Sequence, residues 1–186
     1  NVPVGLIKCA WVGTQIDPWI PAEEYKQDAE MATYYNQIIG TLKKQLADWD
    51  QVAVDAHYNS IMKRWKSQGS KGRKPREKTP PSENKQTPST LFNAMVTPVI
   101  PYAIKGAIWY QGESNANHNT LKYEHNFRTM ITSWRKYWGQ GDFPFYFAQL
   151  ASFQNPVTEP VNFDGWASVC DQQRRTLGLK NTGMAV

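Results

Sequence analysis

The chain has 186 residues and a formal net charge of +5, and apolar residues make up 40% of it. This length fits one domain that buries a core of its own, and this apolar content excludes an intrinsically disordered chain. No apolar run approaches the roughly 20 residues that a membrane span needs, so we expect no membrane segment.

The positive charge is concentrated in one segment. Residues 63–86 carry nine Lys or Arg residues against two Glu residues, which leaves the rest of the chain slightly acidic. The part at 66–88 is also rich in Pro and Ser, and such stretches are usually solvated loops. A nucleic-acid-binding segment would interleave aromatic side chains with the charge, and only Trp65 lies within it. We therefore expect a basic loop and no nucleic-acid partner. A modest attraction for anionic substrates or surfaces stays open.

The first half of the chain predicts one strand and two helices. Residues 3–11 are mostly apolar and predict a buried strand, and because the chain opens directly on it we expect further sequence upstream. A turn follows, in which Gly13 can take backbone angles that other residues avoid. Residues 22–49 lack proline and carry apolar side chains at three- and four-residue steps, which predicts one long helix. Residues 54–65 predict a second helix before the basic loop.

The second half of the chain predicts helices and strands in alternation. Pro98 stops the first of these helices, and Gly139 ends a later one that has a clear apolar face. Alternating strands and helices are typical of a parallel sheet that helices cover. The predicted elements are a helix at 91–97, a strand at 104–109, a helix from Asn119 or Thr120 to Trp138, a strand at 143–150, a helix at 166–177 and the start of a strand at 184–186.

The segment after the predicted strand 104–109 is the most informative part of the sequence. The apolar run ends abruptly in small and polar residues, and Gly112 marks the point where the backbone turns. Ligands of open α/β sheets bind just beyond the carboxyl ends of the strands. A polar connection in which Asn and Ser cap the next helix explains the local chemistry equally well. The candidate site residues are Gln111, Gly112, Glu113, Ser114 and Asn115.

The sequence contains no motif for a cofactor or a metal. Neither G-x-x-x-x-G-K-[ST] nor G-x-G-x-x-G occurs, so a nucleotide site has no support. Cys9 and Cys170 lie in apolar segments without the Cys/His spacing of a metal site. We favour two buried free thiols, while a disulfide between them depends on their geometry. We therefore expect no cofactor and no metal.

Several segments, taken in order, match the pattern of a known family. One is residues 4–20, with Trp11-Val12-Gly13-Thr14-Gln15 at its centre, and another is residues 91–116, which end in Trp109-Tyr110-Gln111-Gly112-Glu113-Ser114-Asn115-Ala116. Residues 134–135, 143–150 and 181–186 agree as well. Together these segments resemble the sialate O-acetylesterase family. The resemblance implies a flavodoxin-like three-layer α/β/α SGNH-hydrolase fold with a parallel sheet. Residues 1–186 would then be part of a single esterase domain, with residues 66–88 as its basic loop.

The resemblance also implies roles for individual residues. Members of the family use a Ser nucleophile, a His base and an Asp that orients the His, and hydrogen-bond donors stabilise the oxyanion. Gly13 corresponds to the glycine whose backbone N–H points into the oxyanion hole, and Gln111 to the side-chain amide donor in that hole. Gly112 lets the backbone turn there, and Glu113 and Asn115 hold the loop or contact the sugar. The implied substrate is an acetylated sialic acid or a related acetylated sugar.

The nucleophile and the catalytic His of the family have no counterpart in these 186 residues. The family's Ser belongs upstream of Val2-Pro3-Val4-Gly5-Leu6, and its His belongs downstream of residues 181–186. His57, His118 and His125 do not match the catalytic His, and Ser114 corresponds to a structural position. We therefore expect the Ser and the His on other segments of the same protein, in a longer chain or in a second processed chain that complements this one. A degenerate relative that only binds carbohydrate is the alternative. The compartment is not predicted, although the family is often secreted or periplasmic.

Overall fold

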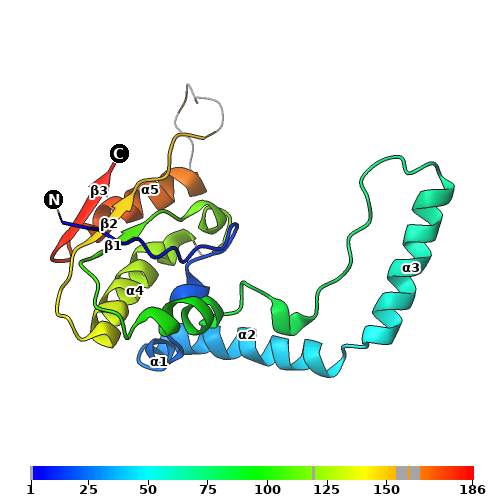
Figure 1. Cartoon of the computed structure of the whole chain (residues 1–186), viewed down its shortest axis with the longest axis horizontal. Helices are drawn as coiled ribbons and strands as arrows, with labels where there is room; N and C mark the ends of the chain where they lie inside the picture. Colours follow the sequence, from blue (N-terminus) through cyan, green and yellow to red (C-terminus); the bar gives the residue numbers. More distant parts are fainter. Residues whose placement is uncertain (1, 119, 154–158, 160–163) are drawn as a thin grey trace. The chain divides into compact units, whose positions relative to one another are not determined.

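The computed structural model describes residues 2–118, 120–153, 159 and 164–186 (Figure 1). The chain divides into two compact units, one that combines the residues up to Ala32 with Lys85–Val186, and one formed by Thr33–Asn84. Within the described residues, no helix is both long and apolar enough to span a membrane. That residues 1–186 form part of a single esterase domain stays a prediction.

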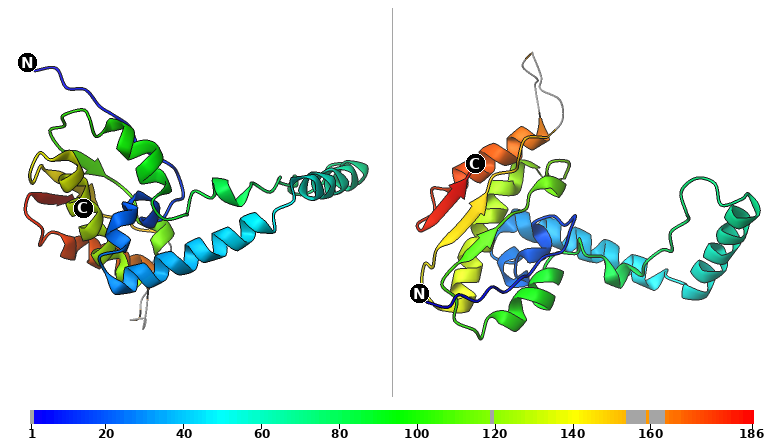
Figure 2. Two further views of the ribbon diagram at one scale, coloured as in Figure 1. Left: turned by 90° about the horizontal axis from the view of Figure 1, so that it is seen from below. Right: turned by 45° about the horizontal axis from the view of Figure 1, so that its top comes forward.

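A parallel three-stranded sheet organises the larger unit. Its strands β1 (Ala107–Trp109), β2 (Phe145–Ala148) and β3 (Thr182–Ala185) lie side by side in chain order. Helix α4 (Tyr123–Trp138) connects β1 to β2, and helix α5 (Gly165–Thr176) lies between β2 and β3 in the chain. Parallel crossovers are right-handed, and both steps run in the same direction across the sheet. The two helices therefore lie on the same face of the sheet, packed against each other (Figure 2).

Aromatic side chains fill the space between the sheet and these helices. Successive strand residues point to opposite faces, and Trp109, Phe145 and Phe147 point toward the helices and are buried. Phe127 of α4 lies against Phe147, with 5.0 Å between the ring centroids, and against Phe145 at 6.0 Å. Trp134 of α4 meets Trp109 at 5.9 Å. The predicted apolar face of this helix is thus confirmed.

The other face of the sheet is open to solvent. Ile108 of β1 and Tyr146 of β2 are direct partners in the strand register and are 84% and 54% exposed. The described residues therefore supply the sheet and a helical layer on one of its faces. This arrangement confirms the α/β class with an open parallel sheet, and it is compatible with an SGNH-hydrolase fold.

The predicted strand at 3–11 is wrong. These residues form no strand, and apolar side chains such as Val4 and Leu6 are exposed. A strand needs a neighbour that pairs with its N–H and C=O groups, and among the described residues no strand pairs with this segment. Cys9 and Cys170 are free thiols, as predicted, but both are half-buried rather than buried.

The predicted single helix at 22–49 is wrong as well. It is divided into α1 (Ala22–Tyr25) and α2 (Ala29–Ala47). Asp28 caps the N-terminus of the second helix, because its Oδ1 accepts a hydrogen bond of 2.8 Å from the N–H of Met31. The apolar residues at helical spacing begin only at Met31, after the break, so their periodicity does not extend to residues 22–28.

The remaining elements follow the predictions with shifted ends. Helix α3 (Gln51–Ser67) contains the predicted helix 54–65, and the basic loop after it is irregular except for one turn of 3-10 helix. The helix expected at 91–97 is a π-helix followed by a 3-10 turn, and Pro98 lies in the first turn of the latter rather than ending a helix. Gly139 ends α4 in the left-handed region, as predicted, while Asn119 lies outside the described residues. The short helices are Asp17–Trp19, Pro81–Glu83, Phe92–Val96, Thr97–Val99, Glu113–Asn115 and Thr120–Lys122.

Candidate functional site

The backbone turns sharply at Gly112, just beyond the end of β1. Gly112 has a φ of +152°, in a region that side chains with a Cβ rarely adopt. A Cβ at this position would lie 3.0 Å from Cγ1 of Val169 and 3.3 Å from Cδ1 of Leu150. Both the backbone angle and the space therefore favour glycine here.

Gln111 joins two loops that are far apart in the sequence. Its side-chain Nε2 donates to the carbonyl oxygen of Thr14 at 3.0 Å and to Oδ1 of Asn115 at 2.8 Å. Its Oε1 accepts a hydrogen bond of 3.1 Å from the hydroxyl of Tyr123. The side chain is buried, and both of its amide hydrogens are used within the protein. Gln111 thus holds the turn around Gly13 against the loop that follows β1.

Asn115 strengthens the same junction from a fully buried position. Its Oδ1 accepts a hydrogen bond of 3.0 Å from the backbone N–H of Ile16, in addition to the one from Gln111. Its Nδ2 donates to the carbonyl oxygen of His118 at 3.4 Å. Of the two roles expected for Asn115, these contacts favour holding the loop over contact with a sugar.

Gly13 offers an unpaired donor beside this junction. It has a φ of +68° and is exposed, and its backbone N–H makes no hydrogen bond to any described residue. Its carbonyl oxygen accepts a hydrogen bond of 2.8 Å from Nε2 of Gln86. The hydroxyl of Thr14 donates to the carbonyl oxygen of Trp11 at 2.9 Å and fixes the turn. A free N–H on a fixed turn is the geometry that an anion-binding donor needs.

Glu113 is exposed, and its Oε2 accepts a hydrogen bond of 3.1 Å from the N–H of Gly112. Ser114 is half-buried and His118 is exposed. His125 lies on the surface of α4, with its Nε2 3.6 Å from Oδ2 of Asp28. Across the described residues, which include every Ser and His of the chain, no Ser hydroxyl is hydrogen-bonded to a His.

Two buried polar residues that sequence reasoning missed connect the strand ends. Gln173 of α5 donates from Nε2 to the carbonyl oxygen of Gln111 at 3.0 Å, and its Oε1 accepts from the N–H of Leu150 at 3.0 Å. The hydroxyl of Tyr123 donates to the same carbonyl at 2.9 Å, and burial raises the pKa of this phenol. The sequence spacing could have indicated that Gln173 is buried, because it lies four residues after Val169 and therefore on the same face of the helix.

A third missed residue, Asp17, is fully buried beside the Gly13 turn. Its Oδ1 accepts a hydrogen bond of 3.3 Å from Nδ2 of Asn126, and its Oδ2 makes none among the described residues. Its backbone carbonyl accepts from the hydroxyl of Tyr25 at 3.0 Å. Burial raises the pKa of Asp17 to about 6, although hydrogen bonding and the attraction of Lys122 oppose this effect.

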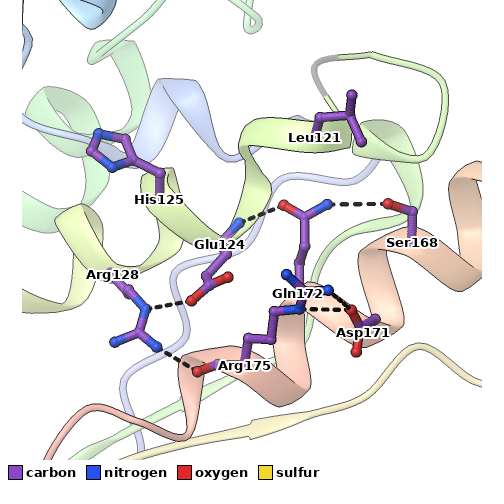
Figure 3. Close-up of a pocket in the computed structure, with 8 residues that line it drawn as sticks. All are labelled: Leu121, Glu124, His125, Arg128, Ser168, Asp171, Gln172 and Arg175. Carbon is purple, nitrogen blue, oxygen red and sulfur yellow. Dashed lines mark hydrogen bonds and ion pairs between the residues drawn. The ribbon is translucent and has the colours of Figure 1, made fainter.

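A surface pocket of about 410 Å³ lies between α4 and α5, and it contains none of the predicted site residues (Figure 3). Its charges pair with one another: Arg128 with Glu124 at 2.9 Å, and Arg175 with Asp171 at 2.6 Å. Within the described residues, no cluster of three or more His, Cys, Asp or Glu side chains could hold a metal ion. The junction of Gly13, Gln111 and Asn115 is therefore the candidate site.

Comparisons with known proteins point to one family. A family model described as carbohydrate esterase, sialic acid-specific acetylesterase, matches residues 1–184. The sialate O-acetylesterases of Pongo abelii and Homo sapiens are each 28% identical over 197 residues, which cover 99% of this chain and 29% of the relative. The sialate O-acetylesterase of Mus musculus is 44% identical over 72 residues, which cover 35% of this chain and 13% of the relative.

A solved structure agrees with these matches. The crystal structure of a carbohydrate acetylesterase from Xanthomonas citri has 40% sequence identity and a TM-score of 0.51, over 56% of this chain and 24% of that one. This chain spans only 29% of the length of the two primate relatives. The family model nevertheless matches almost every residue, so the chain belongs to the sialic acid-specific acetylesterase family of carbohydrate esterases.

Proposed function

We propose that the protein containing this chain removes O-acetyl groups from sialic acids or related acetylated sugars. The observation that carries the proposal is the hydrogen bond from Gln111 Nε2 to the carbonyl oxygen of Thr14, which joins residues 97 positions apart. This bond holds the free N–H of Gly13 beside Gln111, and these are the two residues that the family resemblance identifies as oxyanion donors. Membership of the family supports the same reaction.

The reaction is acyl transfer to a Ser hydroxyl. Attack on the ester carbonyl places negative charge on its oxygen, and neutral N–H donors stabilise this charge without changing their own protonation. The N–H of Gly13 is available for this role. Gln111 uses both amide hydrogens here, so its donation to an oxyanion requires that it exchange one bond, for example the one to Asn115. The contact with the sugar is assigned in this proposal to Glu113, and its exposure to solvent supports the assignment.

The Ser and the His of the proposed mechanism belong to other segments of the same protein. This part of the proposal is supported by the absence of a Ser–His hydrogen bond among the described residues. The first experiment therefore compares hydrolysis of p-nitrophenyl acetate by this chain and by the protein extended at both ends. Activity in the extended protein alone supports the proposal, whereas activity in the short chain requires a nucleophile within it and directs attention to Ser114 and His118.

Gln111→Ala in the extended protein tests the oxyanion role. Loss of one oxyanion donor costs about 2.7–4 kcal/mol, so kcat should fall by about 10²- to 10³-fold while KM changes much less. Gln140→Ala is the matched control, because this amide side chain is exposed and, among the described residues, is hydrogen-bonded only to the backbone of Ile104, at the opposite end of β1. A folded Gln111→Ala variant with unchanged kcat would contradict the role. Sugar binding without hydrolysis by the extended protein would instead favour the carbohydrate-binding alternative.

A further inference from the structure

A stacked aromatic pair lies just beyond the carboxyl end of β2. The rings of Phe153 and Trp166 have centroids 4.7 Å apart and planes inclined by 29°. The indole N–H of Trp166 donates to the carbonyl oxygen of Ala151 at 3.0 Å, and its backbone N–H donates to Oδ1 of Asp164 at 2.7 Å. Trp166 is thus held in place, and it supports one face of Phe153. Phe153 itself is 63% exposed.

The first turn of α5 brings this aromatic pair against the candidate site. Gly165, which precedes Trp166, lies so close to the carbonyl oxygen of Ala116 that a Cβ at this position would overlap it. Ala116 directly follows Asn115 in the loop after β1. The absence of a side chain at Gly165 therefore lets the helix start touch the loop that carries the proposed oxyanion donor.

The segments that carry the two rings also contact Gly112. Leu150, three residues before Phe153, and Val169, three residues after Trp166, both have side-chain atoms within 3.3 Å of the position that a Cβ of Gly112 would take. The segment that carries Phe153 leaves the sheet at the carboxyl end of β2, where ligands of open α/β sheets bind, and Trp166 in the first turn of α5 packs against it. The aromatic pair therefore adjoins the loop that carries Gln111, Gly112 and Asn115.

We propose that the aromatic pair is a sugar-binding platform, on which the apolar C–H face of a pyranose ring stacks against the exposed face of Phe153. The proposal rests on the proposed function and specifies how its substrate is held. The platform carries no charge, so it recognises the ring of the sugar rather than a carboxylate. Aromatic side chains offer a large rigid contact surface of this kind. The stacked sugar would present its acetyl ester toward Gly13 and Gln111.

The test compares two esters in the extended protein. Phe153→Leu keeps an apolar side chain against Trp166 but removes the aromatic face. We expect it to raise KM for an O-acetylated sialic acid by about 3- to 10-fold with kcat nearly unchanged. Hydrolysis of ethyl acetate, which has no ring to stack, should be unaffected. Phe153→Trp should restore KM, and Tyr102→Ala is the matched control, since Tyr102 is 65% exposed and lies before β1 at the other end of the sheet.

The proposed platform would be refuted if Phe153→Leu left KM for the sugar ester unchanged, or if it reduced kcat/KM equally for both esters. If the wild-type protein hydrolyses neither ester, the proposed function fails but the platform is still testable by saturation-transfer NMR with free sialic acid. Magnetisation transfer to the pyranose protons that Phe153→Leu abolishes and Phe153→Trp retains would support it. Transfer that is identical in all three proteins, or absent from the wild type, would refute it.

Discussion

Asp17→Asn should remove a pH-dependent loss of stability. The carboxyl of Asp17 has a pKa of about 6 in the folded chain, against an ordinary value of 3.8, because burial disfavours its charged form. Below pH 3.8 the group is protonated in both folded and unfolded chains and has no effect on their balance. As the pH rises from 3.8 to 6, ionisation of Asp17 stabilises the unfolded chain, while in the folded chain the group stays mostly protonated. The difference corresponds to about 3 kcal/mol, lost from the free energy of unfolding across this interval.

The measurement is the free energy of unfolding by urea, for the original chain and the variant, at about pH 4.5 and about pH 7.5. The variant should gain about 2 kcal/mol relative to the original between these two conditions, because part of the 3 kcal/mol is already lost at the lower pH. Any constant cost of placing an amide beside Asn126 and Tyr25 cancels in this double difference. Asp48→Asn, at an exposed carboxyl, is the control. An Asp17→Asn effect that is equal at both pH values would refute a raised pKa.

Two further substitutions test the packing of the site. Gly112→Ala should lower the free energy of unfolding by about 1–3 kcal/mol, because alanine strains the backbone at a φ of +152° and meets Val169; a urea midpoint within error of the original would contradict this. Gln173→Leu should cost about 1–3 kcal/mol, because it leaves the buried N–H of Leu150 unpaired, while the C=O of Gln111 keeps its hydrogen bond from the Tyr123 hydroxyl. Faster hydrogen exchange at the Leu150 amide would show that the lost stability comes from this hydrogen bond. Unchanged protection there would contradict the proposed link through Gln173.

The sequence predicts the elements that use local patterns. The apolar spacing of α4 and the glycine at its end agree with the structure, because Phe127 and Trp134 pack on the sheet through side chains at helical spacing. Strands β1 and β2 also lie within their predicted ranges. Residues 3–11 fail this test for a physical reason: a strand depends on a neighbour that the local pattern does not contain.

The interior of the site was less accessible to prediction. Gln111, Gly112 and Asn115 were found from their place after a strand and from the family resemblance. Their polar partner Tyr123 lies on the following helix, and Gln173 comes from a distant segment, while the buried Asp17 pairs with Asn126 instead. Hydrogen bonds between residues 62 or 97 positions apart, such as those of Gln111 with Gln173 and with Thr14, leave no periodic trace in the sequence. A polar residue on the apolar face of a helix does indicate that a buried hydrogen bond is needed at that position, but it does not identify the partner.

The chemistry of the junction limits how pH can act on it. Gln111, Asn115 and Gln173 are neutral amides, and burial raises the pKa of Tyr123, so the hydrogen bonds that join the two loops do not change with protonation near neutral pH. The group at the Gly13 turn that changes its protonation near neutral pH is the buried Asp17 carboxyl, whose pKa is about 6. Ionisation of Asp17 lowers the free energy of unfolding, but it leaves intact the side-chain hydrogen bonds of Gln111, Asn115 and Gln173 that align the donors. The donor geometry should therefore stay constant across a pH range in which the stability of the turn declines.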